Sequence, residues 1–181
     1  LELREILKGL RLTSIYVTHD QDEAFSLADR VLIMRKGQLL QVGRPEDIFA
    51  EPANAFVARF VGLDNLVNGT VTDEGRVAKT VLGNFTLPIM ATAGNPITLL
   101  LGDERARLRR YRDKGVPEGL NRFTALVQHR SFRGRTLILQ LESAGMALKF
   151  AVDTSPEHRS IEEGNEVVVE LDPSAIRVLP A

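Results

Sequence analysis

His19 is the residue whose type and position are best suited to chemistry. It follows the uncharged run Thr13–Thr18, which predicts a strand buried on both faces of a parallel sheet. Open α/β proteins bind ligands at the carboxyl edge of such a sheet. An imidazole held there can donate a hydrogen bond to a phosphate oxygen, so His19 is a candidate catalytic and ligand-binding residue. The alternative is an ordinary surface or core histidine.

The acidic residues after His19 predict the start of a helix. Asp20 stands three positions before Glu23, which is the spacing of a capping box. A carboxylate that accepts backbone N–H bonds has a structural role, and we prefer this role for Asp20 to a catalytic one. Gln21, Asp22 and Glu23 then form an acidic first turn that suits the helix dipole and faces solvent.

The elements around His19 alternate between helical spacing and short strands over residues 1–62. The predicted helices have apolar stripes and recognisable ends, and the strands Val31–Met34 and Leu39–Val42 are joined across Lys36-Gly37 as a hairpin. Four helices are predicted. The first carries an apolar stripe from Leu3 to Leu10, and the second begins at Asp20 and ends near Asp29-Arg30. The third begins at Pro45 and ends at Pro52, and the fourth is capped by Asn54 and ends at Gly62.

From residue 66 onward the apolar period changes to two, which is typical of half-buried strands. Glycine-rich breaks separate the strands, and many short strands of this kind predict a barrel. Residues 105–121 interrupt the rhythm and are predicted to be a long exposed connection. The stretches 66–101 and 122–180 fit one barrel or two. The alternating apolar residues that define the later strands are Phe123, Ala125 and Val127; Leu137, Leu139 and Leu141; Leu148, Phe150 and Val152; and Val167, Val169 and Leu171.

Composition excludes several classes of protein. The chain has 181 residues, 44% of them hydrophobic, and a net charge of -1, so neither disorder nor a global basic field is indicated. No apolar run approaches the length of a membrane-spanning helix, no secretory signal follows Leu1, and cysteine is absent, which suits a reducing, cytosolic setting. His19, His129 and His158 lie far apart, so no metal site is predicted.

Several segments, taken in order, resemble the end of the nucleotide-binding domain of ABC transporter ATPases. They are YVTHDQDEA at 16–24, ADRVLIMRKGQ at 28–38, QVG at 41–43 and PEDIF at 45–49. The later segment FVARFVG at 56–62, with Asn65-Leu66 and Gly69, resembles the connection to the OB-like TOBE domain of importer ATPases of the maltose, spermidine, sulfate and ferric-iron type. The resemblance implies an α+β chain, with an incomplete α/β piece of an ABC ATPase domain over residues 1–62 and an all-β, OB-like TOBE barrel over 63–181.

The resemblance also implies a function. His19 corresponds to the switch histidine that contacts the γ-phosphate of ATP between two subunits. The full subunit uses ATP and Mg²⁺ to drive solute uptake, pairs with a second copy of itself, and binds membrane permease subunits at the inner face of the cell membrane. The β domain is expected to hold the dimer together and to serve in regulation.

The chain departs from the family pattern in its catalytic motifs. It contains no Gly-Lys dipeptide for a phosphate loop and no Gly-Gly pair for a signature loop. The strand that carries the Mg²⁺-binding aspartate and the general-base glutamate would precede Leu1. We therefore expect this chain to be inactive as an ATPase on its own, with no cofactor bound. Leu101-Gly102-Asp103-Glu104 stands where the family often has Arg-Pro-Glu, so no role is carried over to that loop.

Two functions of other classes remain as alternatives. One is a stand-alone OB-like regulatory module, or a module that binds small oxyanions, without ATPase activity. The other is a nucleic-acid-binding OB fold, suggested by six basic residues within 105–114 and by the arginines around Phe132. Acidic neighbours dilute the basic charge, so we expect no nucleic-acid partner. The six are Arg105, Arg107, Arg109, Arg110, Arg112 and Lys114.

Overall fold

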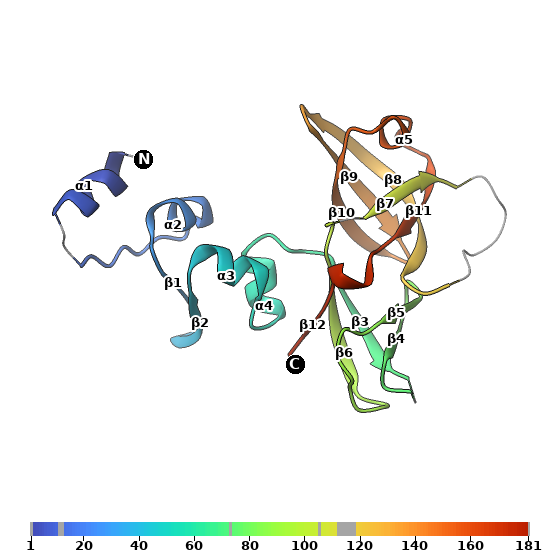
Figure 1. Cartoon of the computed structure of the whole chain (residues 1–181), viewed down its shortest axis with the longest axis horizontal. Helices are drawn as coiled ribbons and strands as arrows, with labels where there is room; N and C mark the ends of the chain where they lie inside the picture. The colour runs from blue at the N-terminus through green and yellow to red at the C-terminus, as the bar shows by residue number, and fades with distance from the viewer. Residues whose placement is uncertain (1, 11–12, 73, 105, 112–118, 181) are drawn as a thin grey trace. The chain divides into compact units, whose positions relative to one another are not determined.

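The chain folds as two compact units, residues 1–62 and 63–181 (Figure 1). The computed structural model describes residues 2–10, 13–72, 74–104, 106–111 and 119–180. Each unit has its own secondary structure and its own buried residues, so each is described by itself.

The first unit contains four helices and one hairpin within its described residues. The hairpin is antiparallel, and Lys36 and Gly37 turn it with φ angles of 47° and 79°. This turn confirms the hairpin that the sequence predicts. The elements in chain order are α1 (Glu2–Leu10), α2 (Gln21–Leu27), β1 (Val31–Arg35), β2 (Gln38–Gly43), α3 (Pro45–Ala50) and α4 (Ala55–Phe60).

The helix ends in this unit follow the capping residues. The side chain of Asn54 accepts hydrogen bonds from the backbone N–H groups of Phe56 and Val57, both at 3.0 Å, and so caps α4. Gly62 follows α4 with a φ of 80°, a conformation that costs glycine little. Pro45 opens α3 as predicted. The helices end about two residues before the predicted positions: α2 stops at Leu27, where Ala28 is already extended, α3 at Ala50 and α4 at Phe60.

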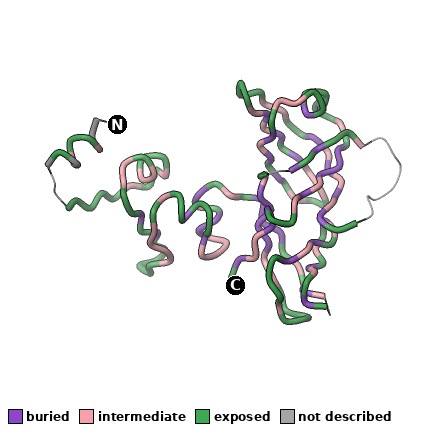
Figure 2. Tube along the Cα trace, in the orientation of Figure 1, coloured by how far each residue is buried: buried purple, intermediate pink, exposed green. Residues whose placement is uncertain are grey.

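The predicted buried strand Thr13–Thr18 is wrong. These residues form no strand, and the side chains of Ile15 and Val17 are 92% and 89% exposed (Figure 2). The physical reason is that a strand of a parallel sheet requires neighbouring strands on either side. Among the described residues no strand pairs with this segment, so its β-forming composition is not sufficient.

The second unit is built almost entirely of antiparallel strands. They form two curled five-stranded sheets, one in the order β12-β6-β3-β4-β5 and the other in the order β10-β9-β8-β11-β7 (Figure 1). The strands are β3 (Leu66–Val71), β4 (Val77–Thr80), β5 (Asn84–Thr86), β6 (Pro96–Leu101), β7 (Arg107–Arg110), β8 (Arg122–Arg133), β9 (Thr136–Ser143), β10 (Met146–Asp153), β11 (Glu166–Glu170) and β12 (Ile176–Leu179). A short helix α5 (Pro156–Arg159) and a 3₁₀ turn η1 (Pro173–Ala175) complete the unit.

Both sheets share one hydrophobic core, whose buried residues run from Val67 to Ile176. The last strand, β12, returns to pair with β6, so the early and late parts of the unit are tied together. The alternating residues of β8, β9, β10 and β11 all point into this core, as predicted. Buried positions alternate with less buried ones along much of β8, β9 and β10 (Figure 2), whereas Val167, Val168 and Val169 of β11 are all buried.

The predicted long connection over 105–121 is only partly right. Arg107–Arg110 forms the strand β7, which pairs with β11. The alternation of side chains along a strand explains how so basic a segment can form β7, because Leu108 enters the core while Arg107 and Arg109 lie on the exposed face. Residues 112–118 lie outside the described residues. Within the part of the chain that the structure describes, no helix is long and apolar enough to span a membrane.

Candidate functional site

His19 lies in the first unit, between the extended segment 13–18 and helix α2. A small hydrogen-bond network fixes the residues on both sides of it. The Thr18 hydroxyl accepts from the Asp20 N–H at 3.0 Å and donates to the Glu23 carboxylate at 2.9 Å. Asp20 Oδ1 accepts from the Glu23 N–H at 3.0 Å, which confirms Asp20 as the helix cap.

The imidazole of His19 is exposed and has no hydrogen-bond partner within the described residues. The residues on either side of it, Thr18 and Asp20, form hydrogen bonds, whereas the ring nitrogens of His19 can still bind a ligand. An available imidazole N–H is a suitable donor to a phosphate oxygen, so the residue type and its setting fit the role that the sequence predicts. The role itself stays a prediction.

Glu23 is a further member of this network, whereas the sequence predicts for it only a capping-box position in a solvent-facing first turn. Its carboxylate accepts from the Tyr16 hydroxyl at 3.2 Å as well as from Thr18. The hydrogen bond and the negative charge of Glu23 raise the pKa of Tyr16 above its ordinary value. Spacings of five and seven residues across an extended segment carry no recognisable sequence signal, so these contacts were not predicted.

A polar hollow of about 420 Å³ also lies in the first unit. Arg4, Asp29 and Arg44 are among the residues that line it, and Arg4 approaches Asp29 at 3.4 Å. His19 is not among its lining residues. The hollow and the candidate histidine are thus separate features of the unit.

The other two histidines have partners in the second unit. His129 Nδ1 lies 2.9 Å from Glu163, and His158 Nδ1 lies 2.7 Å from Asp153. Groups of three or more ligating side chains suited to a metal ion do not occur among the described residues. His158 is buried, and its position next to Asp153 was not singled out by the sequence reading, although the Ser155-Pro156 helix start was a local signal.

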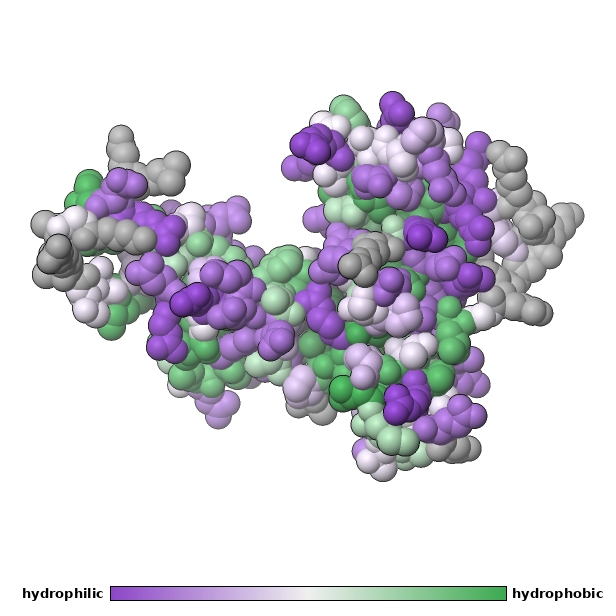
Figure 3. Space-filling model, in the orientation of Figure 1, coloured by the Kyte–Doolittle hydropathy of each residue, from purple (hydrophilic) through white to green (hydrophobic). Residues whose placement is uncertain are grey.

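The basic cluster is partly neutralised where it is described. Glu170 Oε2 lies 3.7 Å from Arg109 Nη2, and Glu170 Oε1 lies 3.0 Å from Arg122 Nη2. One carboxylate therefore forms ion pairs with two guanidinium groups. In Figure 3 the visible face of the second unit carries hydrophilic residues among smaller hydrophobic areas. Arg105, Arg112 and Lys114 lie outside the described residues.

Part of the second unit matches a known domain family. Residues 103–179 match the family described as the TOBE domain. The chain also shares its fold with ModG, a cytoplasmic molybdate-binding protein, at a TM-score of 0.51 and 12% sequence identity, covering 65% of this chain and 96% of that one. The sheets and these matches confirm the expected OB-like TOBE fold.

Relatives of the chain are import ATP-binding proteins. The spermidine/putrescine import ATP-binding protein PotA of Oleidesulfovibrio alaskensis is 35% identical over 151 residues, which are 79% of this chain and 40% of the relative. PotA of Escherichia coli K12 and of Shigella boydii are each 36% identical over 155 residues, 81% of this chain and 40% of theirs. The chain thus spans about 40% of the length of these relatives. The predicted resemblance to the C-terminal portion of an ABC importer ATP-binding subunit is confirmed.

Proposed function

We propose that the chain is the C-terminal portion of the ATP-binding subunit of an ABC-type solute importer. The observation that carries this proposal is the identity of 35–36% with import ATP-binding proteins, which extends over 79–81% of the chain and so includes both units. The full subunit couples ATP hydrolysis to uptake across the membrane, and residues 1–62 are the end of its nucleotide-binding domain.

His19 acts in this subunit as a hydrogen-bond donor to the γ-phosphate of ATP. The support is its exposed imidazole, flanked by Thr18 and by the helix cap Asp20. A fixed donor aimed at developing negative charge contributes to phosphoryl transfer without taking a covalent part. Because this chain contains no phosphate-loop dipeptide Gly-Lys, ATP and Mg²⁺ are held mainly by other parts of the subunit, and the chain alone binds neither.

The subunit works as a homodimer with membrane permease subunits, on the cytoplasmic face of the cell membrane. Residues 63–181 contribute a regulatory domain that joins the two copies. The support is again the relatedness to import ATP-binding proteins, together with the match of residues 103–179 to the TOBE domain.

The test is the ATPase rate of a subunit in which the chain is joined to the upstream portion of its own gene product. His19→Ala is expected to lower kcat by about a hundredfold, the usual effect of removing one donor to transition-state charge. The matched control is His129→Ala, which removes another exposed histidine, one that lies beside Glu163, and should leave the rate unchanged.

Two results would contradict parts of the proposal separately. An active subunit that His19→Ala leaves at full rate would remove His19 from the mechanism while the importer assignment stands. An upstream portion that has no phosphate loop, and no ATPase activity in the joined protein, would overturn the assignment itself.

The alternative is a stand-alone OB-like module that regulates or binds a small oxyanion without ATPase activity. Its specific support is the fold shared with ModG. Calorimetric titration of the 181-residue chain with molybdate and with sulfate tests it. Saturable binding, together with a joined subunit that has no ATPase activity, would favour this alternative. The absence of any binding heat with either anion would contradict it.

A further inference from the structure

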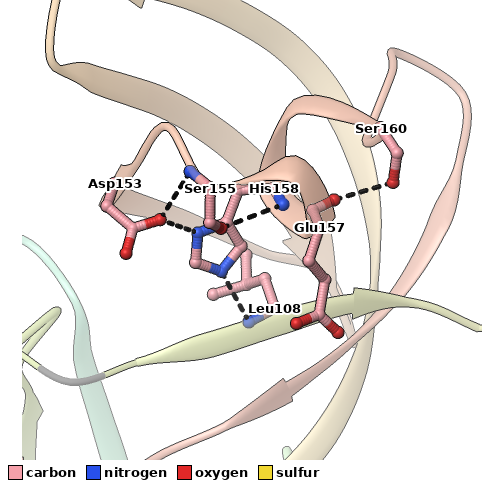
Figure 4. Close-up of polar contacts among 6 residues, drawn as sticks. All are labelled: Leu108, Asp153, Ser155, Glu157, His158 and Ser160. Carbon is pink, nitrogen blue, oxygen red and sulfur yellow. Dashed lines mark hydrogen bonds and ion pairs between the residues drawn. The ribbon is translucent and has the colours of Figure 1, made fainter.

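His158 is buried, and it belongs to α5, which lies at one end of the second unit (Figure 1). The start of this short helix is capped by the Ser155 hydroxyl. The side chain of His158 is 10% exposed and points from α5 toward the strand β7, between Asp153 on one side and Leu108 on the other (Figure 4). Both ring nitrogens therefore meet polar groups.

The two contacts define which nitrogen carries the proton. The Leu108 N–H donates to Nε2 at 3.4 Å, so Nε2 must present its lone pair. Nδ1 lies 2.7 Å from Asp153 Oδ1 and so donates its proton to that carboxylate. The arrangement fits a neutral imidazole with its proton on Nδ1.

The Leu108 N–H is on the outer edge of its sheet. Strand β7 is the last strand of the order β10-β9-β8-β11-β7, and the Tyr111 N–H donates to the Glu166 carbonyl of β11 at 2.8 Å. In an antiparallel pair the bonded positions alternate, so Leu108, three residues before Tyr111, directs its N–H away from β11. His158 thus supplies the acceptor that an additional strand would otherwise supply.

We propose that His158 is an acid-sensitive latch: protonation of its Nε2 removes the acceptor for the Leu108 N–H and releases the outer edge of β7 from α5. The proton comes from water and forms an Nε2–H bond. Two donors then face each other, and the hydrogen bond that joins the helix to the strand is lost.

The charged groups around His158 come from three elements. Asp153, at the end of β10, stays ionised because hydrogen bonds from the Ser155 backbone, then from the Ser155 side chain and His158, lower its pKa to about 2. On α5 itself, Glu157 extends past the ring toward β7 (Figure 4), and Arg159 is the next residue along the chain after His158. On β7, Arg110 shares the Leu108 face, whereas Arg107 and Arg109 project to the other.

Because Asp153 remains negative throughout the range in which histidine titrates, acidification changes the charge of His158 and not that of its partner. The consequence is local: α5 keeps its contact with Asp153 while its contact with β7 weakens.

The experiment follows His158 and the Leu108 amide together by NMR in the 181-residue chain. The protection factor of the Leu108 amide against hydrogen exchange should fall by about fivefold between about pH 8 and about pH 5, the effect of losing one hydrogen bond. The midpoint should coincide with the titration of the His158 ring. Unchanged protection while the ring titrates, or a ring that does not titrate in this range, would overturn the proposal.

Three variants separate the latch from a merely structural role. His158→Gln places a non-titrating amide oxygen near the position of Nε2, so Leu108 protection should lose its pH dependence. Asp153→Asn keeps a partner for Nδ1 without the charge, and the loss of Leu108 protection should still follow the titration of the His158 ring. His129→Gln is the matched control and should change neither. A His158→Gln chain that keeps the wild-type pH dependence would overturn the proposal, even if its overall stability were altered.

Discussion

At the scale of single residues, Asn65 acts as a substitute for a strand. Its side-chain amide donates to the Lys149 carbonyl and its amide oxygen accepts from the Lys149 N–H, both at 2.7 Å. Lys149 lies in β10, an edge strand of its sheet, and Asp103 accepts from the next outward N–H, that of Ala151, at 3.1 Å. Two side chains thus cover an edge that would otherwise be open to pairing.

Replacing Asn65 by alanine should destabilise the second unit by about 2 kcal/mol, because two hydrogen bonds are lost where the side chain is buried. Asn68→Ala is the matched control, since the side chain of Asn68 is exposed and accepts one bond, from Thr98. The measurement is urea denaturation followed by circular dichroism. Equal midpoints for the two variants would contradict the strand-like role of Asn65.

At the scale of elements, sequence predicts best what local chemistry decides. Asp20, Asn54 and Pro45 mark their helix starts because each acts on backbone groups within three residues. The alternation of β8, β9 and β10 can also be read from the sequence, because burial of one face imposes it residue by residue. The candidate histidine could be selected from its place after a strand-like run, although the run itself forms no strand.

The elements that sequence did not predict depend on distant partners. Strand β7 has one apolar residue, Leu108, among arginines, and its assignment as a strand rests on pairing with β11, about sixty positions away. Thr13–Thr18 shows the converse, a composition suited to a strand whose partners are not among the described residues. His158 likewise meets Leu108 across fifty positions of sequence, so its setting follows from the fold alone.

The cap of α2 gives a prediction at this scale. Asp20→Ala should cost α2 about 1 kcal/mol, because the Glu23 N–H loses its acceptor at the first turn. Asp22→Ala is the control, since Asp22 lies in the same turn and is not the cap. Amide hydrogen exchange of residues 21–27 reports the difference. Faster exchange in both variants alike would assign the effect to charge near the helix dipole instead of to the cap.

At the scale of the whole molecule, the two units differ in what holds them together. The core that joins both sheets lies wholly within residues 63–181. The first unit buries a smaller apolar set among its described residues, and it leaves Leu32, Met34 and Leu39 of its hairpin more than half exposed. The buried set is Val31, Ile33, Ile48, Val57, Ala58 and Val61. Hydrophobic stabilisation follows the area removed from water, so the first unit should open at a lower free energy.

Substitutions in each core should therefore act on one unit at a time. Phe123 is 2% exposed and its ring meets those of Phe85 and Phe150, so Phe123→Ala should destabilise residues 63–181 by about 4 kcal/mol. Val57→Ala, at a fully buried position of α4, should destabilise only residues 1–62. Hydrogen exchange read by mass spectrometry on peptides from each unit distinguishes the two responses. If either substitution raised exchange equally in both units, the chain would unfold as one cooperative body, and the stability of the first unit would have to come from contacts other than its own core.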